Sequence, residues 1–174
     1  MLCKRYELKE GARMGPGPSA DKEGRVQNRH MRWTPDGVTY EADPRHYEKL
    51  VQELGLGQPE EAGGSGEAGD PLGSQSNPVK SVSTPCVKVT TEMASQDVPL
   101  PAAKVSHFRG LAARANYLAA DRPDIQYAAK EICRWMQEPT ELGVQALKRL
   151  ARYLKGKPRL VFNYPWQEAF TRGS

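Results

Sequence analysis

The chain has few cysteines and no long apolar run, and both absences limit what it can be. Its 174 residues include three cysteines, Cys3, Cys86 and Cys133, whose odd number and wide spacing fit neither a disulfide framework nor a zinc motif. No run of about 18 apolar residues is present, which argues against a membrane span. The first residues also lack the apolar core of a signal peptide. We therefore expect an intracellular protein, cytoplasmic or nuclear, with no membrane partner.

Large apolar side chains are scarce in the middle of the chain. Only 38% of all residues are hydrophobic, and Gly (16) and Pro (14) are frequent. Within residues 60–78 the one large apolar side chain is Leu72, too little to offset the entropy of ordering the backbone. We expect residues 57–103 to form a flexible, acidic linker, with one edge strand near residues 87–90.

Residues 1–56 are predicted to contain a β-hairpin followed by a helix. Pro35, Asp36 and Gly37 are typical of a hairpin turn, and the run after them is β-branched and aromatic. Asp43 is expected to cap a helix whose first position is a proline. Gly55 is expected to end that helix.

Residues 104–165 are predicted to form three amphipathic helices and a closing strand, followed by a tail at 166–174. The first helix is expected from about residue 106 to 120, and the second starts at Pro123 and ends before Pro139. Thr140 is expected to cap the third helix, which ends at Gly156. Residues 159–164 read as a strand. The chain as a whole is therefore assigned to the α+β class.

A search for catalytic residues finds no suitable constellation. Metal-dependent phosphoryl chemistry requires clustered carboxylates, but Asp121 and Asp124 straddle a helix break and read better as charges at a helix start. His30, His46 and His107 are isolated in the sequence. We expect no catalytic residue, no metal ion and no cofactor.

Positive charge is concentrated at the C-terminal end. Residues 104–174 carry thirteen Lys or Arg against six Asp or Glu. Such a balance favours a polyanionic partner, although charge alone explains the cations of residues 148–159 slightly better as a solvated helix face. The candidate nucleic-acid-binding residues are Lys148, Arg149, Arg152, Lys155 and Lys157.

Several motifs in one span resemble copia-type LTR retrotransposon polyproteins. Residues 32–46 resemble the segment of these polyproteins that follows the polymerase palm, and Ser83-Thr84-Pro85 resembles a connecting motif. The strongest similarity covers residues 108–165. Its motifs are Phe108-Arg109, Tyr117-Leu118, the run Arg122, Pro123, Asp124 and Ile125, then Pro139-Thr140, Ala146 to Arg149 and Arg152 to Gly156.

The resemblance implies a fragment of a reverse transcriptase and RNase H polyprotein. Residues 1–56 would be the end of the thumb region, and residues 104–165 the connection that precedes RNase H. The polymerase carboxylates would lie before Met1 and the RNase H carboxylates beyond Tyr164, so the fragment would be non-catalytic by itself. Its implied partners are a template–primer duplex and the missing polymerase and RNase H domains. A protein-interaction scaffold and a non-functional retroelement remnant are the alternatives.

Overall fold

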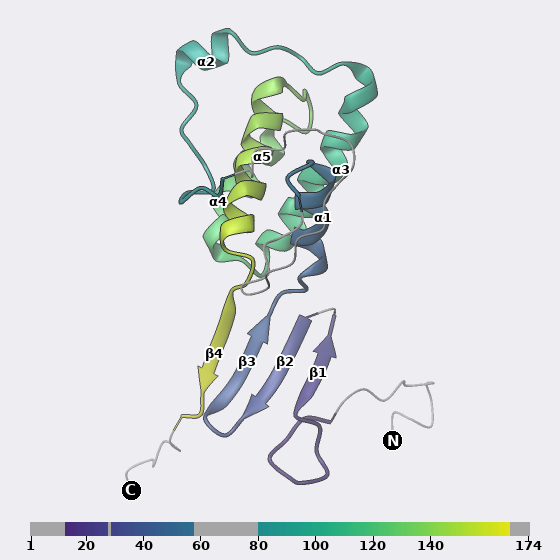
Figure 1. Cartoon of the computed structure of the whole chain (residues 1–174), viewed down its shortest axis with the longest axis vertical. Coiled ribbons are helices and arrows are strands. Elements are labelled where there is room, and N and C mark those ends of the chain that lie inside the picture. Colours follow the sequence, from purple (N-terminus) through teal and green to yellow (C-terminus); the bar gives the residue numbers. More distant parts are fainter. Residues whose placement is uncertain (1–12, 28, 58–79, 168–174) are drawn as a thin grey trace, which may run out of the picture. The chain divides into compact units, whose positions relative to one another are not determined.

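The computed structural model describes residues 13–27, 29–57 and 80–167, and the chain divides into two compact units (Figure 1). The sheet unit combines Met1–Asp43 with Arg159–Ser174, and the helical unit is Pro44–Pro158. The predicted mixture of helices and antiparallel strands is confirmed. Residues 58–79 of the predicted acidic linker lie outside the described residues.

The sheet unit contains a four-stranded sheet in which each strand pairs with the next one along the chain. The order is β1-β2-β3-β4, and all three pairings are antiparallel. Strand β1 was not predicted, because the hairpin signal at Pro35, Asp36 and Gly37 indicates only the two strands that flank it. The strands are β1 (Glu23–Val26), β2 (Arg29–Thr34), β3 (Gly37–Glu41) and β4 (Val161–Pro165).

The predicted hairpin is the β2–β3 pair. Pro35 and Asp36 form the connection, and the Thr34 hydroxyl donates to the Gly37 carbonyl at 2.9 Å. Gly37 is needed at this position because a Cβ built there would collide with the Tyr164 carbonyl oxygen and lie 2.8 Å from the Pro165 Cα. A glycine therefore allows β4 to approach the end of β3.

The predicted closing strand pairs with β3. From the sequence it was expected to belong to the unit of the three C-terminal helices. Tyr40 and Phe162 are cross-strand partners, with ring centroids 6.1 Å apart. Arg159 donates to both carboxylate oxygens of Glu41 at 2.6 Å, across 118 residues of sequence. Such cross-strand pairs stabilise a sheet, but they join residues too distant in sequence for local patterns to reveal.

Four longer helices pack together in the helical unit (Figure 1). The largest fully buried side chains of this unit are apolar: Leu50, Val51, Leu111, Ile125, Ile132, Leu147, Leu150 and Leu154. The elements are α1 (Arg45–Glu53), α2 (Thr91–Ser95), α3 (Ala102–Ala119), the 3₁₀ helix η2 (Pro123–Ile125), α4 (Gln126–Arg134) and α5 (Glu141–Gly156).

The first helix belongs to the helical unit, where it contacts α3 and α5. It begins at Arg45, with Pro44 rather than Asp43 in the cap position. Gly55 ends it as predicted, with a φ of 66°. The Gly55 amide donates to Gln52 at 3.0 Å and the Leu56 amide to Val51 at 3.1 Å, the two hydrogen bonds of a Schellman motif.

Two predicted boundaries in the C-terminal helices, the start of α3 and the end of α4, differ from the structure. Helix α3 starts at Ala102, immediately after Pro101, rather than near residue 106. The second helix opens as 3₁₀ turns at Pro123, and α4 ends at Arg134, so Met136 lies beyond it. The cap of α5 is confirmed, because the Thr140 hydroxyl accepts from the Gly143 amide at 3.4 Å.

Residues 87–90 do not form the predicted edge strand. They run without regular secondary structure, and Thr90 instead caps the short helix α2 by accepting from the Met93 amide at 3.3 Å. A side-chain cap competes locally with strand pairing. Across the three described ranges, no helix combines the length and apolar character needed to span a membrane.

Candidate nucleic-acid interface

The sequence run Arg122 to Ile125 is a structural clamp at the centre of the helical unit. Arg122 is 2% exposed and donates to both carboxylate oxygens of Asp124, at 2.9 and 2.8 Å. Its remaining donors reach the carbonyls of Lys157 (2.9 Å) and Pro158 (3.2 Å), just after α5. Ile125 is fully buried. This motif therefore fixes the end of α5 against the start of α4.

Asp124 is held in its ionised form by this clamp. Burial alone would raise its pKa, but the hydrogen bonds and charge of Arg122, together with the Tyr153 hydroxyl at 3.0 Å, outweigh burial and lower it. Burial and the hydrogen bond to Asp124 raise the pKa of Tyr153 in turn. Asp124 therefore has a structural role at the start of a helix, in line with the sequence-based interpretation of this residue.

Arg109 donates to carbonyls that follow α4, as Arg122 donates to carbonyls that follow α5. Its Nε donates to the Met136 carbonyl at 2.7 Å and its Nη2 to the Gln137 carbonyl at 3.0 Å. These carbonyls follow the end of α4, where backbone acceptors lack partners within the helix. Arginines of two separate sequence motifs therefore stabilise the C-terminal ends of two helices.

The five candidate binding residues do not share one environment. Lys155 is half-buried and donates to the Leu56 carbonyl at 3.3 Å, which ties α5 to the end of α1. The Lys157 ammonium lies 5.4 Å from the centre of the Tyr153 ring, a cation–π arrangement. Lys148 is exposed. The remaining two arginines contact a separate part of the chain.

Residues 80–90 lie against α5, and we call them the docked segment. Arg149 donates from Nη2 to the Thr84 hydroxyl at 2.7 Å, and Arg152 donates from Nε to the Lys80 carbonyl at 3.0 Å. A Cβ added at Gly156 would lie 2.8 Å from the Ser81 Cβ. The absence of a side chain at this helix end therefore permits the close approach of the docked segment.

A basic groove of about 400 Å³ runs between the docked segment and α5. Val87, Val89, Met93 and Leu142 supply part of its apolar wall. Its cationic lining residues are Lys88, Lys148, Arg149 and Arg152, and no Asp or Glu is among the described residues that line it. A groove of this kind concentrates positive potential, which attracts phosphate groups.

The structure thus brings three candidate residues into one groove and leaves two outside it. Lys148, Arg149 and Arg152 line the groove, whereas Lys155 and Lys157 are engaged elsewhere. Sequence reasoning missed Lys88, which is exposed and belongs to the docked segment. The only signal would have been its position in the otherwise apolar run Val87-Lys88-Val89.

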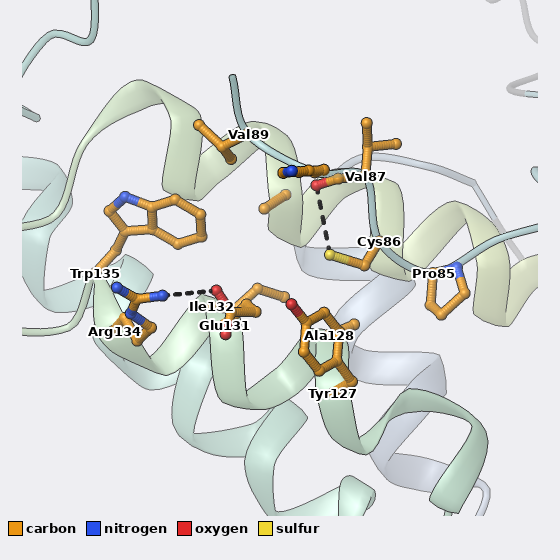
Figure 2. A pocket seen from close by; sticks show the side chains of 12 residues that line it. Pro85, Cys86, Val87, Val89, Tyr127, Ala128, Glu131, Ile132, Arg134 and Trp135 are labelled. Carbon is orange, nitrogen blue, oxygen red and sulfur yellow. Dashed lines mark hydrogen bonds and ion pairs between the residues drawn. The ribbon is translucent and has the colours of Figure 1, made fainter. Parts of the chain in front are cut away.

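A second groove of about 760 Å³ lies on the α4 side of the docked segment (Figure 2). Figure 2 shows the Trp135 ring near Val89, and Cys86 and Tyr127 farther along the groove. Glu131 forms ion pairs with Lys130 (3.2 Å) and Arg134 (3.0 Å). The hydrogen bond from Lys130 is the main reason why the pKa of Glu131 is lowered. This groove combines aromatic and charged side chains.

Clusters of metal-ligating side chains are absent from the described part of the chain. No set of three or more His, Cys, Asp or Glu side chains there is placed to hold a metal ion. His46 packs against Tyr117, with ring centroids 4.6 Å apart, and His30 lies 3.1 Å from the Arg25 guanidinium. Burial raises the pKa of the Cys133 thiol, which disfavours the nucleophilic thiolate.

Curated proteins of Arabidopsis thaliana resemble part of this chain. A retrovirus-related Pol polyprotein from transposon RE1 is 47% identical over 53 residues, which cover 30% of this chain and 4% of that protein. The corresponding polyprotein from transposon RE2 is 42% identical over 53 residues, with the same coverage. An uncharacterized mitochondrial protein is 38% identical over 78 residues, which cover 44% of this chain and 31% of that protein.

These similarities connect the chain to retrotransposon polyproteins. The chain spans about 4% of the two polyproteins and about a third of the mitochondrial protein. No protein-family model matches it, and no solved structure does. The predicted relationship to retroelement polyproteins is therefore supported at the level of homology over part of the chain.

Proposed function

We propose that this chain is the part of a copia-type polyprotein that joins the reverse transcriptase thumb to RNase H. We further propose that it contacts a template–primer duplex through the basic groove and has no catalytic activity by itself. The homology to Pol polyproteins and the order of the motifs in residues 108–165 support the origin. The groove supports the contact.

The observation that carries the nucleic-acid contact is the composition of the basic groove. Lys88, Lys148, Arg149 and Arg152 come from two segments far apart in sequence, yet they line one concave surface. Neutralising two to four phosphates would release condensed counterions, so the logarithm of the binding constant would fall with the logarithm of salt with a slope of about −2 to −4. Such binding would be independent of base sequence.

The proposal is tested by measuring duplex binding as a function of salt. A fluorescent RNA–DNA hybrid of fixed length is titrated with the full chain at several salt concentrations. The decisive variant is Lys88→Glu with Lys148→Glu, because both side chains are exposed groove residues. We expect it to weaken binding and to make the salt slope shallower by about 2.

The matched control is Lys49→Glu with Lys104→Glu, which makes the same charge change at exposed lysines of α1 and α3. Equal weakening by both double variants would mean that net charge, not the groove, determines binding. Primer extension with Mg²⁺ and a primed template tests the second half of the proposal, because extension by this chain alone would contradict it.

A protein-interaction module is the second candidate, and the aromatic groove favours it. Tyr127 is 65% exposed and Val87 is 52% exposed, and both line the groove together with Trp135, so apolar surface is accessible along it. Exposed apolar patches are typical of surfaces that contact other proteins. Absence of duplex binding even at low salt would favour this candidate over the nucleic-acid contact.

A further inference from the structure

Thr84 has an exposed hydroxyl, and the Arg149 guanidinium already lies against it. It lies in the docked segment, in a stretch without helix or strand, and Pro85 follows it. Its hydroxyl oxygen accepts a hydrogen bond from Arg149 Nη2 at 2.7 Å, which leaves the hydroxyl proton on the residue. An accessible hydroxyl outside helices and strands, followed by proline, has the form of a substrate for proline-directed protein kinases.

Arg149 is incompletely satisfied in the unmodified chain. Its Nε is buried and has no hydrogen-bond partner among the described residues, although its Nη2 reaches Thr84. A buried donor without an acceptor is uncommon and costs stability. A hydroxyl offers one oxygen to a guanidinium that has donors on several nitrogens, whereas a phosphate offers three oxygens that suit this planar group.

We propose that Thr84 is a phosphorylation site and that Arg149 clamps the phosphate. A proline-directed Ser/Thr kinase would transfer the γ-phosphoryl group of ATP. The bond between the γ-phosphorus and the bridging oxygen breaks, a bond between phosphorus and Thr84 Oγ1 forms, the hydroxyl proton passes to the kinase base, and ADP leaves. The phosphate then takes the acceptor position opposite Arg149, whose Nε gains a partner.

The modification changes the charge of the basic groove. Phosphothreonine adds about −1.5 to −2 charges at pH 7 and forms strong hydrogen bonds with arginine. Arg149 is also one of the four cations that line the basic groove, so the phosphate would neutralise one of these four charges. Phosphorylation therefore fastens the docked segment to α5 and weakens duplex binding. The last consequence rests on the proposed function, whereas the site itself does not.

The chain contains an internal control in Thr34, which is also followed by proline. Its hydroxyl donates to the Gly37 carbonyl at 2.9 Å, and its own carbonyl accepts from the Trp166 indole at 3.3 Å. Thr34 is therefore half-buried and engaged in the β2–β3 turn. A kinase that requires an accessible hydroxyl outside regular structure should leave Thr34 unmodified.

The experiment treats the full chain with a recombinant proline-directed kinase and ATP–Mg²⁺. Mass spectrometry should place one phosphate on Thr84 and none on Thr34, and Thr84→Ala should abolish incorporation. The phosphorylated chain should show a Tm higher by about 2–4 °C. Phosphorus NMR should show the second pKa of the phosphate lowered by about 1 unit from its ordinary value near 6.

Two arginine variants separate a clamp from a general effect of charge. Arg149→Gln should still be phosphorylated but should lose both the Tm increase and the lowered phosphate pKa. Arg152→Gln should retain most of both, because Arg152 donates to the Lys80 carbonyl rather than to Thr84. If Arg149→Gln folds poorly, the phosphate pKa of the unaltered chain and of Arg152→Gln still tests the proposal. It should be lowered in both, and an ordinary value in both would overturn the clamp.

The proposal is overturned if folded chain is not modified at Thr84, or if phosphorylation leaves Tm and phosphate pKa unchanged. It is also overturned if Arg149→Gln and Arg152→Gln behave alike. Duplex binding provides the distinguishing measurement. An unphosphorylated chain that fails to bind duplex would refute the proposed function while a Tm increase on phosphorylation would still support the site.

Discussion

Arg122 and Asp124 form a two-pronged ion pair in which both carboxylate oxygens accept from one buried guanidinium, at 2.9 and 2.8 Å. The same guanidinium binds the carbonyls of Lys157 and Pro158, so it joins the break between α3 and α4 to the end of α5. The motif that runs from Arg122 to Ile125, one of those shared with copia-type polyproteins, therefore has a structural role in this chain. Four hydrogen bonds converge on one side chain that water cannot reach.

Replacing Arg122 should be more damaging than replacing Arg109. Arg122→Met leaves a half-buried carboxylate and two helix-end carbonyls without their donor, and we expect a loss of about 3 kcal/mol in the free energy of unfolding. Arg109→Met removes two carbonyl bonds from an exposed side chain and should cost about 1 kcal/mol. Urea denaturation of both variants measures the difference. Equal losses would mean that burial of the pair is unimportant.

The stability conferred by Asp124 should disappear in acid. Its pKa in the folded chain lies below the ordinary value of 3.8, so the unfolded chain binds the proton more readily. The contribution is therefore fully present above about pH 4 and is lost as the pH falls through the folded-state pKa. The difference in unfolding free energy between the unaltered chain and Asp124→Asn should be constant near neutrality and shrink below pH 4. A difference that persists unchanged at pH 2 would contradict this assignment.

Two glycines in helices should respond to alanine in opposite directions. A Cβ at Gly143 would lie 3.1 Å from the Phe108 Cζ and from the Trp135 Cβ, so Gly143→Ala should destabilise by about 1–2 kcal/mol through overpacking. Gly110 lies in α3 with nothing within 4 Å of the same position. Gly110→Ala should therefore stabilise by up to about 1 kcal/mol through helix propensity. Thermal unfolding of the two variants tests the contrast.

Local patterns were sufficient to predict the elements with their own sequence signals. The hairpin turn at Pro35 and Asp36, the helix end at Gly55 and the cap at Thr140 each depend on neighbouring residues, and each is present. The apolar stripe of α5 was also predicted, because helical spacing identifies which side chains share a face.

Features that depend on distant residues could not be predicted in the same way. The pairing of β4 with β3 and the contact of α1 with α5 join segments on either side of residues 58–79. The cations were predicted as candidate binding residues, but in the structure Arg149 and Arg152 donate to the docked segment and Lys155 donates to the Leu56 carbonyl. Whether a cation faces water or a carbonyl depends on tertiary contacts that charge spacing does not encode.

The docked segment can be tested through the reactivity of two cysteines. Cys86 lies in that segment, whereas Cys133 lies in α4 and its thiol has a pKa raised by burial. In a Cys3→Ser background, which removes the third thiol, thiol-reactive dye should label Cys86 faster than Cys133. The Cys133 rate should also keep rising above pH 9, because only the thiolate reacts.

Removing the two arginine contacts should raise the labelling rate of Cys86 and leave that of Cys133 unchanged. Arg149→Gln with Arg152→Gln deletes the hydrogen bonds to Thr84 and to the Lys80 carbonyl, so the segment should detach more often and the Cys86 rate should rise several-fold. Cys133 should be unaffected, since it packs near the Ala112 carbonyl on α3. A parallel increase at both cysteines would instead indicate that the helical unit as a whole has lost stability. The matched control is Lys148→Gln, which removes a neighbouring α5 cation that makes no hydrogen bond or ion pair within the described residues, and it should leave both rates unchanged.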